Sequence, residues 1–73
     1  MSRILVVEDS QVNRMLAAGQ LEQLGWEAVL AVSGEEALDL FGTDEFVAVL
    51  MDWNLPGIDG LETTRRIRRS GHL

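Results

Sequence analysis

The chain has 73 residues, six arginines against twelve acidic residues, no cysteine and no lysine, and a formal net charge of −6. This length allows one small domain, which we take as residues 1–73, and the missing cysteine excludes disulfides and thiolate metal sites. The acidic balance argues against a nucleic-acid surface, and no apolar run reaches the roughly 20 residues that cross a bilayer. We therefore expect a soluble, cytoplasmic chain.

Two hydrophobic periods alternate along the sequence and predict the order βαβαβα. The predicted elements, with approximate bounds, are a strand over Arg3–Val7, a helix over Gln11–Leu24, a strand over Ala28–Val32, a helix over Gly34–Gly42, a strand over Phe46–Met51 and a helix over Gly60–Arg69. Strands that are joined through helices run parallel, and right-handed crossovers on both faces favour the sheet order 2-1-3. The predicted class is an α/β fold with helices on both faces.

Polar residues at the predicted helix ends support these bounds. Ser10 precedes the first helix and Gly25 follows it, as is typical of a helix start and stop. Ser33 and Glu36 have the spacing of a capping box, and Asp59 with Glu62 repeats it. A stripe of residues recurs at helical spacing on the first helix, at Asn13, Ala17, Leu21 and Leu24, and the expected buried stripe of the second helix is Ala37, Leu38 and Phe41.

Acidic residues follow two of the predicted strands. Glu8 and Asp9 come after the first strand and Asp52 after the third, so the order 2-1-3 brings all three to one sheet edge, where open α/β sheets bind ligands. Oxygen ligands of this kind favour Mg²⁺, whereas zinc is disfavoured by one histidine and no cysteine. Asp52 is also a candidate nucleophile toward phosphorus. The simpler alternatives are a loop-capping Asp52 and a helix-dipole role for the acidic pair.

Four segments together resemble the receiver domain of two-component response regulators: Val6–Ser10, Leu24–Gly25, Ser33–Leu38 and Leu50–Gly60. The resemblance covers all 73 residues in one register. Asn13 and Arg14 are similar to the residues found in receivers attached to hybrid sensor kinases. The fold that the resemblance implies is a truncated, flavodoxin-like (βα)3 half domain, equivalent to the first three of five βα units.

The resemblance implies a phosphoacceptor and not an enzyme. Asp52 would take a phosphoryl group from a histidine on a histidine kinase or a histidine phosphotransfer protein. Asp9, Asp52 and the backbone carbonyl of Asn54 would bind Mg²⁺, with Glu8 acting through a metal-bound water. Asn13 is expected to make a polar contact at the rim of the site.

The 73 residues also depart from the receiver pattern. A whole receiver resembles five βα units and has a Ser or Thr after strand 4 and a Lys after strand 5; Thr63 and Thr64 lie on a predicted helix and are no substitute. We therefore expect acceptor chemistry without signal output. The third strand would present an open edge, which predicts either a poorly stable fragment or a homodimer joined through that edge.

Two rival functions follow from the same residues. A haloacid-dehalogenase-like phosphatase also uses a strand-end aspartate with Mg²⁺, but it needs an acid two residues later, where this chain has Asn54. The other rival is a half-domain assembly module that is never phosphorylated. Stoichiometric, Mg²⁺-dependent labelling that vanishes in Asp52→Asn supports the receiver interpretation, and failure to label a well-folded chain contradicts it. Turnover of a phosphorylated metabolite would instead favour the enzyme.

Overall fold

The structure, a computed structural model, describes residues 2–43, 45–52 and 57–69. Its elements are β1 (Arg3–Val7), α1 (Gln11–Gln23), β2 (Glu27–Ala31), α2 (Gly34–Thr43), β3 (Ala48–Met51) and α3 (Gly60–Arg69). The predicted βαβαβα order is confirmed. The largest difference is at β3, which begins at Ala48 and not at Phe46. Phe46 precedes the strand, and its ring stacks on Phe41 of α2 with 6.2 Å between ring centroids.

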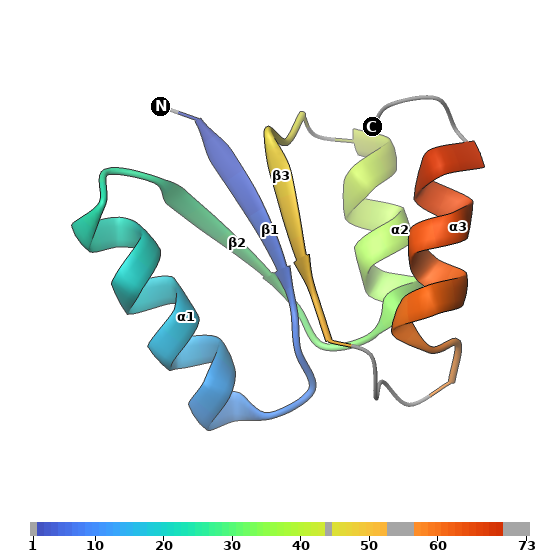
Figure 1. Ribbon diagram of the computed structural model, residues 1–73, viewed down its shortest axis with the longest axis horizontal. Helices are drawn as coiled ribbons and strands as arrows, with labels where there is room; N and C mark the ends of the chain where they lie inside the picture. Colours follow the sequence, from blue (N-terminus) through green and yellow to red (C-terminus); the bar gives the residue numbers. More distant parts are fainter. Residues whose placement is uncertain (1, 44, 53–56, 70–73) are drawn as a thin grey trace.

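The three strands form a parallel sheet in the order β2-β1-β3, as predicted. In its register Val7 lies opposite Ala31 on one side and Met51 on the other, so β1 and β3 end level with each other. Helix α1 covers one face of the sheet, and α2 and α3 lie side by side over the other (Figure 1). The predicted layers are therefore confirmed.

The hydrophobic core lies between the sheet and the α2–α3 pair. Alternate strand residues point to this side, because successive side chains of a strand face opposite ways. The core residues are Leu5, Val7, Ala31, Ala37, Phe41 and Ile67. Two of the three residues expected on the stripe of the second helix, Ala37 and Phe41, are thus buried, and Leu38 packs against them.

The caps predicted for the helices are present, with one difference. Ser33 Oγ accepts a hydrogen bond from the backbone N–H of Glu36 at 3.1 Å. The Glu36 carboxylate does not return to the N–H of Ser33 as a capping box requires; it accepts the N–H of Val32 at 3.2 Å. The bond made by the Glu36 carboxylate is therefore shifted by one residue, from the N–H of Ser33 to that of Val32. Val32 directly follows β2, and its N–H needs a partner there.

Helix α1 ends as predicted at Gly25, which has a φ of 88°. The N–H groups of Gly25 and Trp26 return to the carbonyls of Glu22 and Leu21, both at 3.0 Å, which is the Schellman arrangement. Of the residues at helical spacing on this helix, Ala17 and Leu21 are half-buried, whereas Asn13 and Leu24 at the two ends are exposed. Leu24 is 74% exposed, because it is the C-cap residue and lies beyond the last turn that faces the sheet.

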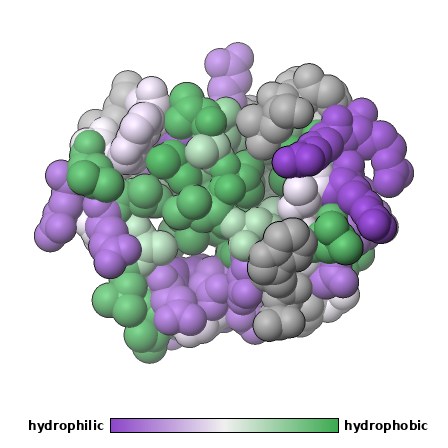
Figure 2. All heavy atoms as spheres, in the orientation of Figure 1, coloured by the Kyte–Doolittle hydropathy of each residue, from purple (hydrophilic) through white to green (hydrophobic). Residues whose placement is uncertain are grey.

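Helix α1 buries none of its residues, whereas α2 and α3 each bury three. Figure 2 shows apolar side chains gathered over the middle of the molecule. The large exposed apolar residues include Val12, Met15 and Leu16 of α1 and Leu50 of β3. Among the helices of the described residues, none is long and apolar enough to cross a membrane.

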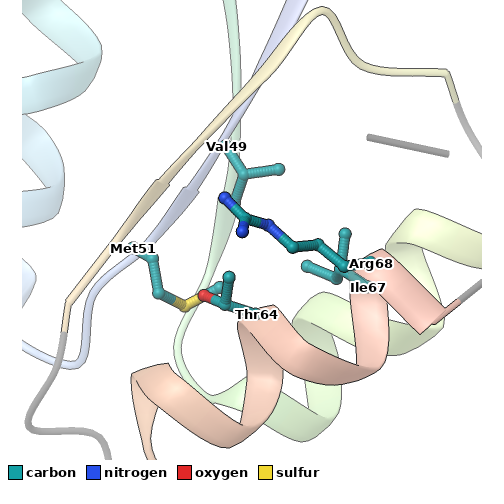
Figure 3. Close-up of a pocket in the computed structure, with 5 residues that line it drawn as sticks. All are labelled: Val49, Met51, Thr64, Ile67 and Arg68. Atoms are coloured by element: carbon teal, nitrogen blue, oxygen red, sulfur yellow. The ribbon is translucent and has the colours of Figure 1, made fainter. Parts of the chain in front are cut away.

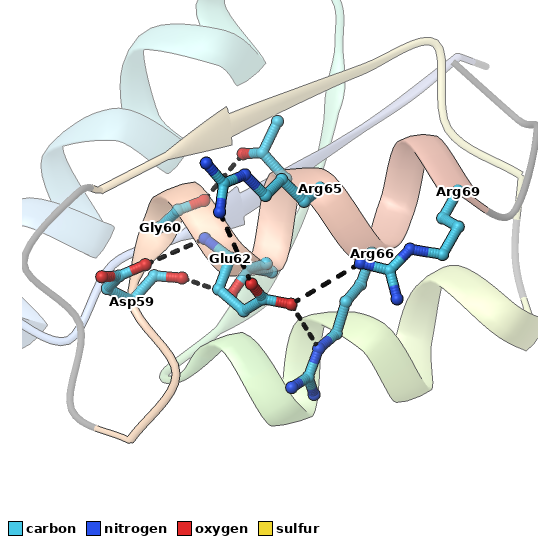
Figure 4. A network of polar contacts seen from close by, with 8 residues as sticks. Asp59, Gly60, Glu62, Arg65, Arg66 and Arg69 are labelled. Atoms are coloured by element: carbon cyan, nitrogen blue, oxygen red, sulfur yellow. Dashed lines mark hydrogen bonds and ion pairs between the residues drawn. The ribbon is translucent and has the colours of Figure 1, made fainter.

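Two carboxylates organise helix α3, one at its start and one on its surface. Asp59 Oδ1 caps the helix by accepting the N–H of Glu62 at 2.9 Å, which confirms Asp59 as an N-cap. The Glu62 side chain then faces three arginines: Arg66 at 2.9 Å and Arg65 and Arg69 at 4.0 Å (Figure 4). These arginines lie toward the negative end of the helix dipole, and the network keeps them on the surface of α3.

Candidate metal centre

Three carboxylates meet where β1 and β3 end. Glu8 and Asp9 follow β1, Asp52 follows β3, and one oxygen from each lies within 4.8 Å of the others. The strands hold this arrangement, because the N–H of Asp52 continues the ladder by donating to the carbonyl of Val7 at 2.9 Å. The juxtaposition predicted for Glu8, Asp9 and Asp52 is therefore present. Asn54, the fourth predicted ligand, lies outside the described residues.

Hydrogen bonds fix the orientation of Glu8. Its Oε1 accepts the side-chain N–H of Asn13 at 3.1 Å and the backbone N–H of Ser10 at 3.3 Å. The polar contact expected for Asn13 is thus present, and its partner is one of the three acids. Because these bonds use only Oε1, the second carboxylate oxygen of Glu8 is left for other contacts.

Arg14 holds the turn that carries the acidic pair. One nitrogen of its guanidinium donates to the carbonyls of Glu8 and Asp9, both at 2.9 Å. The sequence interpretation gave Arg14 no role at the site. The signal was present in the spacing, because Arg14 lies on the first turn of α1 and is the only cation between Arg3 and residue 65.

An open hollow of about 320 Å³ lies beside the acids, between α1 and β3. Its lining joins the acidic edge to an apolar wall; the lining residues are Val6, Val7, Glu8, Asn13, Ala17, Leu50, Met51 and Asp52. Glu8 and Asp52 are half-buried and Asp9 is exposed. The site is therefore reached from solvent on the α1 side of the sheet.

The donor set of this site suits a hard cation. Three anionic carboxylates within 4.8 Å repel one another, and a divalent cation relieves this repulsion. The donors are all oxygen, which Mg²⁺ and Ca²⁺ prefer, and the chain has no cysteine that would favour a softer metal. The positive end of the α1 dipole, capped by Ser10, lies at the same corner and also favours negative charge there.

A second hollow, of about 300 Å³, lies between β3 and α3 (Figure 3). Val49, Met51 and Ile67 line it together with Thr64 and Arg68. No carboxylate is among these residues, and the Thr64 hydroxyl donates within its own helix to the carbonyl of Gly60 at 2.8 Å. This hollow therefore offers an apolar surface with one cation and no metal ligands.

Comparison with known proteins identifies the family. The response regulator receiver domain family matches residues 4–73. The virulence sensor protein BvgS of Bordetella bronchiseptica is 50% identical over 66 residues, which are 90% of this chain and 5% of that protein. The chain thus spans a small part of this relative.

Solved structures show the same relationship. The response regulator protein TrrA of Thermotoga maritima, in complex with Mg²⁺-BeF, has a TM-score of 0.93 at 41% identity, over 96% of this chain and 61% of that chain. TrrA in complex with the histidine kinase ThkA has a TM-score of 0.90 at 42% identity, over 94% and 60%. These neighbours confirm the flavodoxin-like class, and the chain belongs to the response regulator receiver domain family.

Proposed function

We propose that this chain is the phosphoacceptor part of a two-component phosphorelay and that Asp52 is the acceptor. A carboxylate oxygen of Asp52 attacks the phosphorus of a phosphohistidine. The new O–P bond forms as the N–P bond breaks, and the bonding electron pair returns to the histidine ring, which takes up a proton. The observation that carries this proposal is the meeting of Glu8, Asp9 and Asp52 at one sheet edge.

Asp52 is the best acceptor of the three acids. The Glu8 carboxylate already accepts hydrogen bonds from Asn13 and Ser10. Asp9 lies in a turn whose shape is fixed by the bond from Arg14 to the Asp9 backbone carbonyl. Asp52 instead stands at the end of β3, where the strand ladder fixes its backbone and its side chain borders the hollow. The other two acids are therefore suited to holding a metal beside it.

The proposed metal is Mg²⁺, held by Asp9, Asp52 and the backbone carbonyl of Asn54, with Glu8 acting through a water molecule. When bound, Mg²⁺ supplies positive charge that offsets the negative charge on the transferring phosphoryl group. The oxygen-only cluster supports this assignment, as does the Mg²⁺-BeF complex of the related TrrA. For Asn54 the proposal rests on its sequence position alone.

The proposed donor is a histidine kinase or a histidine phosphotransfer protein. The solved complex of ThkA with TrrA supports this class of partner, because TrrA shares this fold at 42% identity. Histidine kinases take their phosphoryl group from ATP, so we place the reaction in the cytoplasm. We also propose that residues 1–73 act as one unit in accepting the phosphoryl group, which the family match over residues 4–73 supports.

Phosphoryl labelling tests the proposed function. The chain is incubated with a small acyl phosphate, with Mg²⁺ or with a chelator, and its intact mass is measured. We expect one phosphoryl group per chain, only with Mg²⁺, and none in Asp52→Asn. Asp39→Asn, an exposed acid on α2, is the matched control and should label normally. Labelling of Asp52→Asn, or no labelling of a folded chain, would contradict the proposal.

A second candidate function is assembly of two chains through β3. Within the described residues β3 pairs with β1 on one side only, and the apolar hollow beside α3 adjoins its other edge. We propose that the isolated 73-residue chain pairs there with a second copy, because an open edge offers backbone groups to another strand. Sedimentation over a range of concentrations should show a dimer, with β3 amides that exchange more slowly as it forms. A monomer at every concentration would contradict it.

A further inference from the structure

The first turn of α2 reaches across to the segment that joins Asp52 to α3. Glu35 Oε2 accepts a hydrogen bond from the backbone N–H of Ile58 at 3.3 Å. These two residues are 23 positions apart in the chain. The contact therefore ties the segment after β3 to a helix that contributes nothing to the acidic cluster itself.

The same carboxylate lies against Gly57. Gly57 has a φ of 71°, a conformation that side chains rarely adopt. A Cβ atom at this position would also overlap the Glu35 carboxylate, meeting Oε1 at 3.0 Å and Cδ at 3.1 Å. Glycine is thus required twice here, once for the turn and once for the approach of Glu35.

Further close contacts surround Ile58 at the start of α2. At Gly34 a Cβ atom would overlap Thr63 Oγ1 and meet Ile58 Cγ1 at 2.7 Å, so α2 approaches both residues closely. Thr63 is fully buried, and its hydroxyl donates to the carbonyl of Asp59 at 2.8 Å. The start of α2, the residues before α3 and the first turn of α3 therefore form one packed corner.

Asp52 and Ile58, which lie on either side of positions 53–56, are both anchored by hydrogen bonds. The Asp52 N–H donates to the carbonyl of Val7 within the sheet, and the Glu35 carboxylate accepts the N–H of Ile58. We propose that Glu35 is a positioning residue for the acidic site: it fixes Gly57 and Ile58, which follow Asp52 by five and six positions in the chain, and so sets the Mg²⁺ concentration that acceptor chemistry requires. This inference rests on the proposed function.

The expected effect is local, because the Glu35 bond is exposed and Glu35 is not part of the core. A net hydrogen bond of this kind corresponds to a change of about 2- to 10-fold in an equilibrium. Loss of Glu35 should therefore loosen Gly57 and Ile58 without unfolding the chain. Substitutions at Gly34 or Thr63 would instead disturb close packing in the interior of the corner, and would lower the stability of the whole chain.

The first test measures amide exchange at Ile58 by NMR without metal. In Glu35→Ala we expect exchange about 2- to 10-fold faster at Ile58, with α1 amides unchanged. Glu35→Gln should restore protection, because its amide oxygen accepts the same N–H, and Asp39→Ala controls for the loss of an α2 charge. Equal protection of Ile58 in Glu35→Ala and the parent chain would overturn the proposal, as would the same loss in Asp39→Ala.

The second test measures the Mg²⁺ concentration that gives half-maximal acyl-phosphate labelling. We expect it to rise about 2- to 10-fold in Glu35→Ala, with the rate at saturating Mg²⁺ nearly kept, and to return toward the parent value in Glu35→Gln. An unchanged requirement in Glu35→Ala overturns the positioning role. Such a result leaves the proposed function intact, since that depends on whether Asp52→Asn abolishes labelling.

Gly57→Ala tests the same contact from the other side and does not require Glu35→Ala to fold. Gly57→Ala retains Glu35 but displaces its carboxylate, so it too should speed exchange at Ile58. In Gly57→Ala with Glu35→Ala the overlap is gone, and the two effects should combine to less than their product. Independent, fully multiplicative effects would show that the two residues do not act through one contact.

Discussion

The two faces of the sheet differ in how completely their helices bury them. The face under α2 and α3 is closed, with Leu5, Phe41 and Ile67 buried in one cluster. The face under α1 is more open: Ile4 and Val6 of β1 are buried there, but the helix itself buries no residue and Leu50 of β3 is 46% exposed. The acidic hollow lies on the open side. Stability is thus concentrated on one face and chemistry on the other, so substitutions should separate the two.

The largest contrast should come from two leucine truncations. Leu5→Ala removes a fully buried side chain from the closed face and should cost about 3 to 5 kcal/mol of unfolding free energy. Leu16→Ala, on the outer side of α1 where the residue is 60% exposed, should change it by less than about 0.5 kcal/mol. Urea denaturation at one fixed protein concentration measures both. Equal losses would show that the α1 face carries a second core.

Mg²⁺ should act only through the open face. Ligand binding at about 100 times the dissociation constant stabilises a protein by about 2.7 kcal/mol, and Asp9→Asn should reduce this to about half or less. In chelator the sign reverses: Asp9→Asn should be more stable than the parent by up to about 1 kcal/mol, because one of three crowded carboxylates is gone.

Thermal or urea denaturation with Mg²⁺ and with chelator tests this sign change. Asp39→Asn is the control, since it removes an exposed acid on the other side of the sheet and should alter neither value. If Asp9→Asn were less stable than the parent in chelator, Asp9 would be making a structural contact, and the metal role proposed for it would lose its support.

Arg14→Ala tests whether the open face also depends on its own polar contacts. The change removes two hydrogen bonds from a charged donor to the carbonyls of Glu8 and Asp9, so we expect a loss of about 1 to 3 kcal/mol and weaker Mg²⁺ binding. Arg65→Ala on α3 is the matched control and should cost less than about 1 kcal/mol. Urea denaturation and a Mg²⁺ titration measure the two effects. Equal, small losses would mean that the acidic turn holds its shape without Arg14.

Much of this architecture could be predicted from local sequence signals. Alternating periods gave the element order, and the acids after two strands gave the cluster of Glu8, Asp9 and Asp52 once the order 2-1-3 was inferred. These features depend on short-range patterns and on one rule of topology. The helix ends at Ser10 and Gly25 were predictable for the same reason.

The contacts that the sequence interpretation missed join residues that are distant in the chain or compete for one group. Glu35 reaches Ile58 and Gly57 across the corner, and no spacing rule indicates that partner. The Glu36 carboxylate was expected to accept the backbone N–H of Ser33, but it accepts the N–H of Val32 instead. Leu24 fits a helical stripe by position, yet it is exposed because the helix has already ended. Such outcomes depend on tertiary packing.

The smallest effects should lie on the surface of α3, away from both faces. Glu62→Ala removes a carboxylate from three arginines but leaves the backbone N–H that Asp59 caps, so it should cost about 0.5 kcal/mol or less. Asp59→Ala removes the cap itself and should cost about 1 kcal/mol. In 1 M salt the Glu62→Ala loss should shrink toward zero, while the Asp59→Ala loss should be largely kept, because screening weakens exposed ion pairs more than a local cap. Urea denaturation at two salt concentrations separates them, and a Glu62→Ala loss larger than that of Asp59→Ala would show that the arginine network, and not the cap, holds α3 in place.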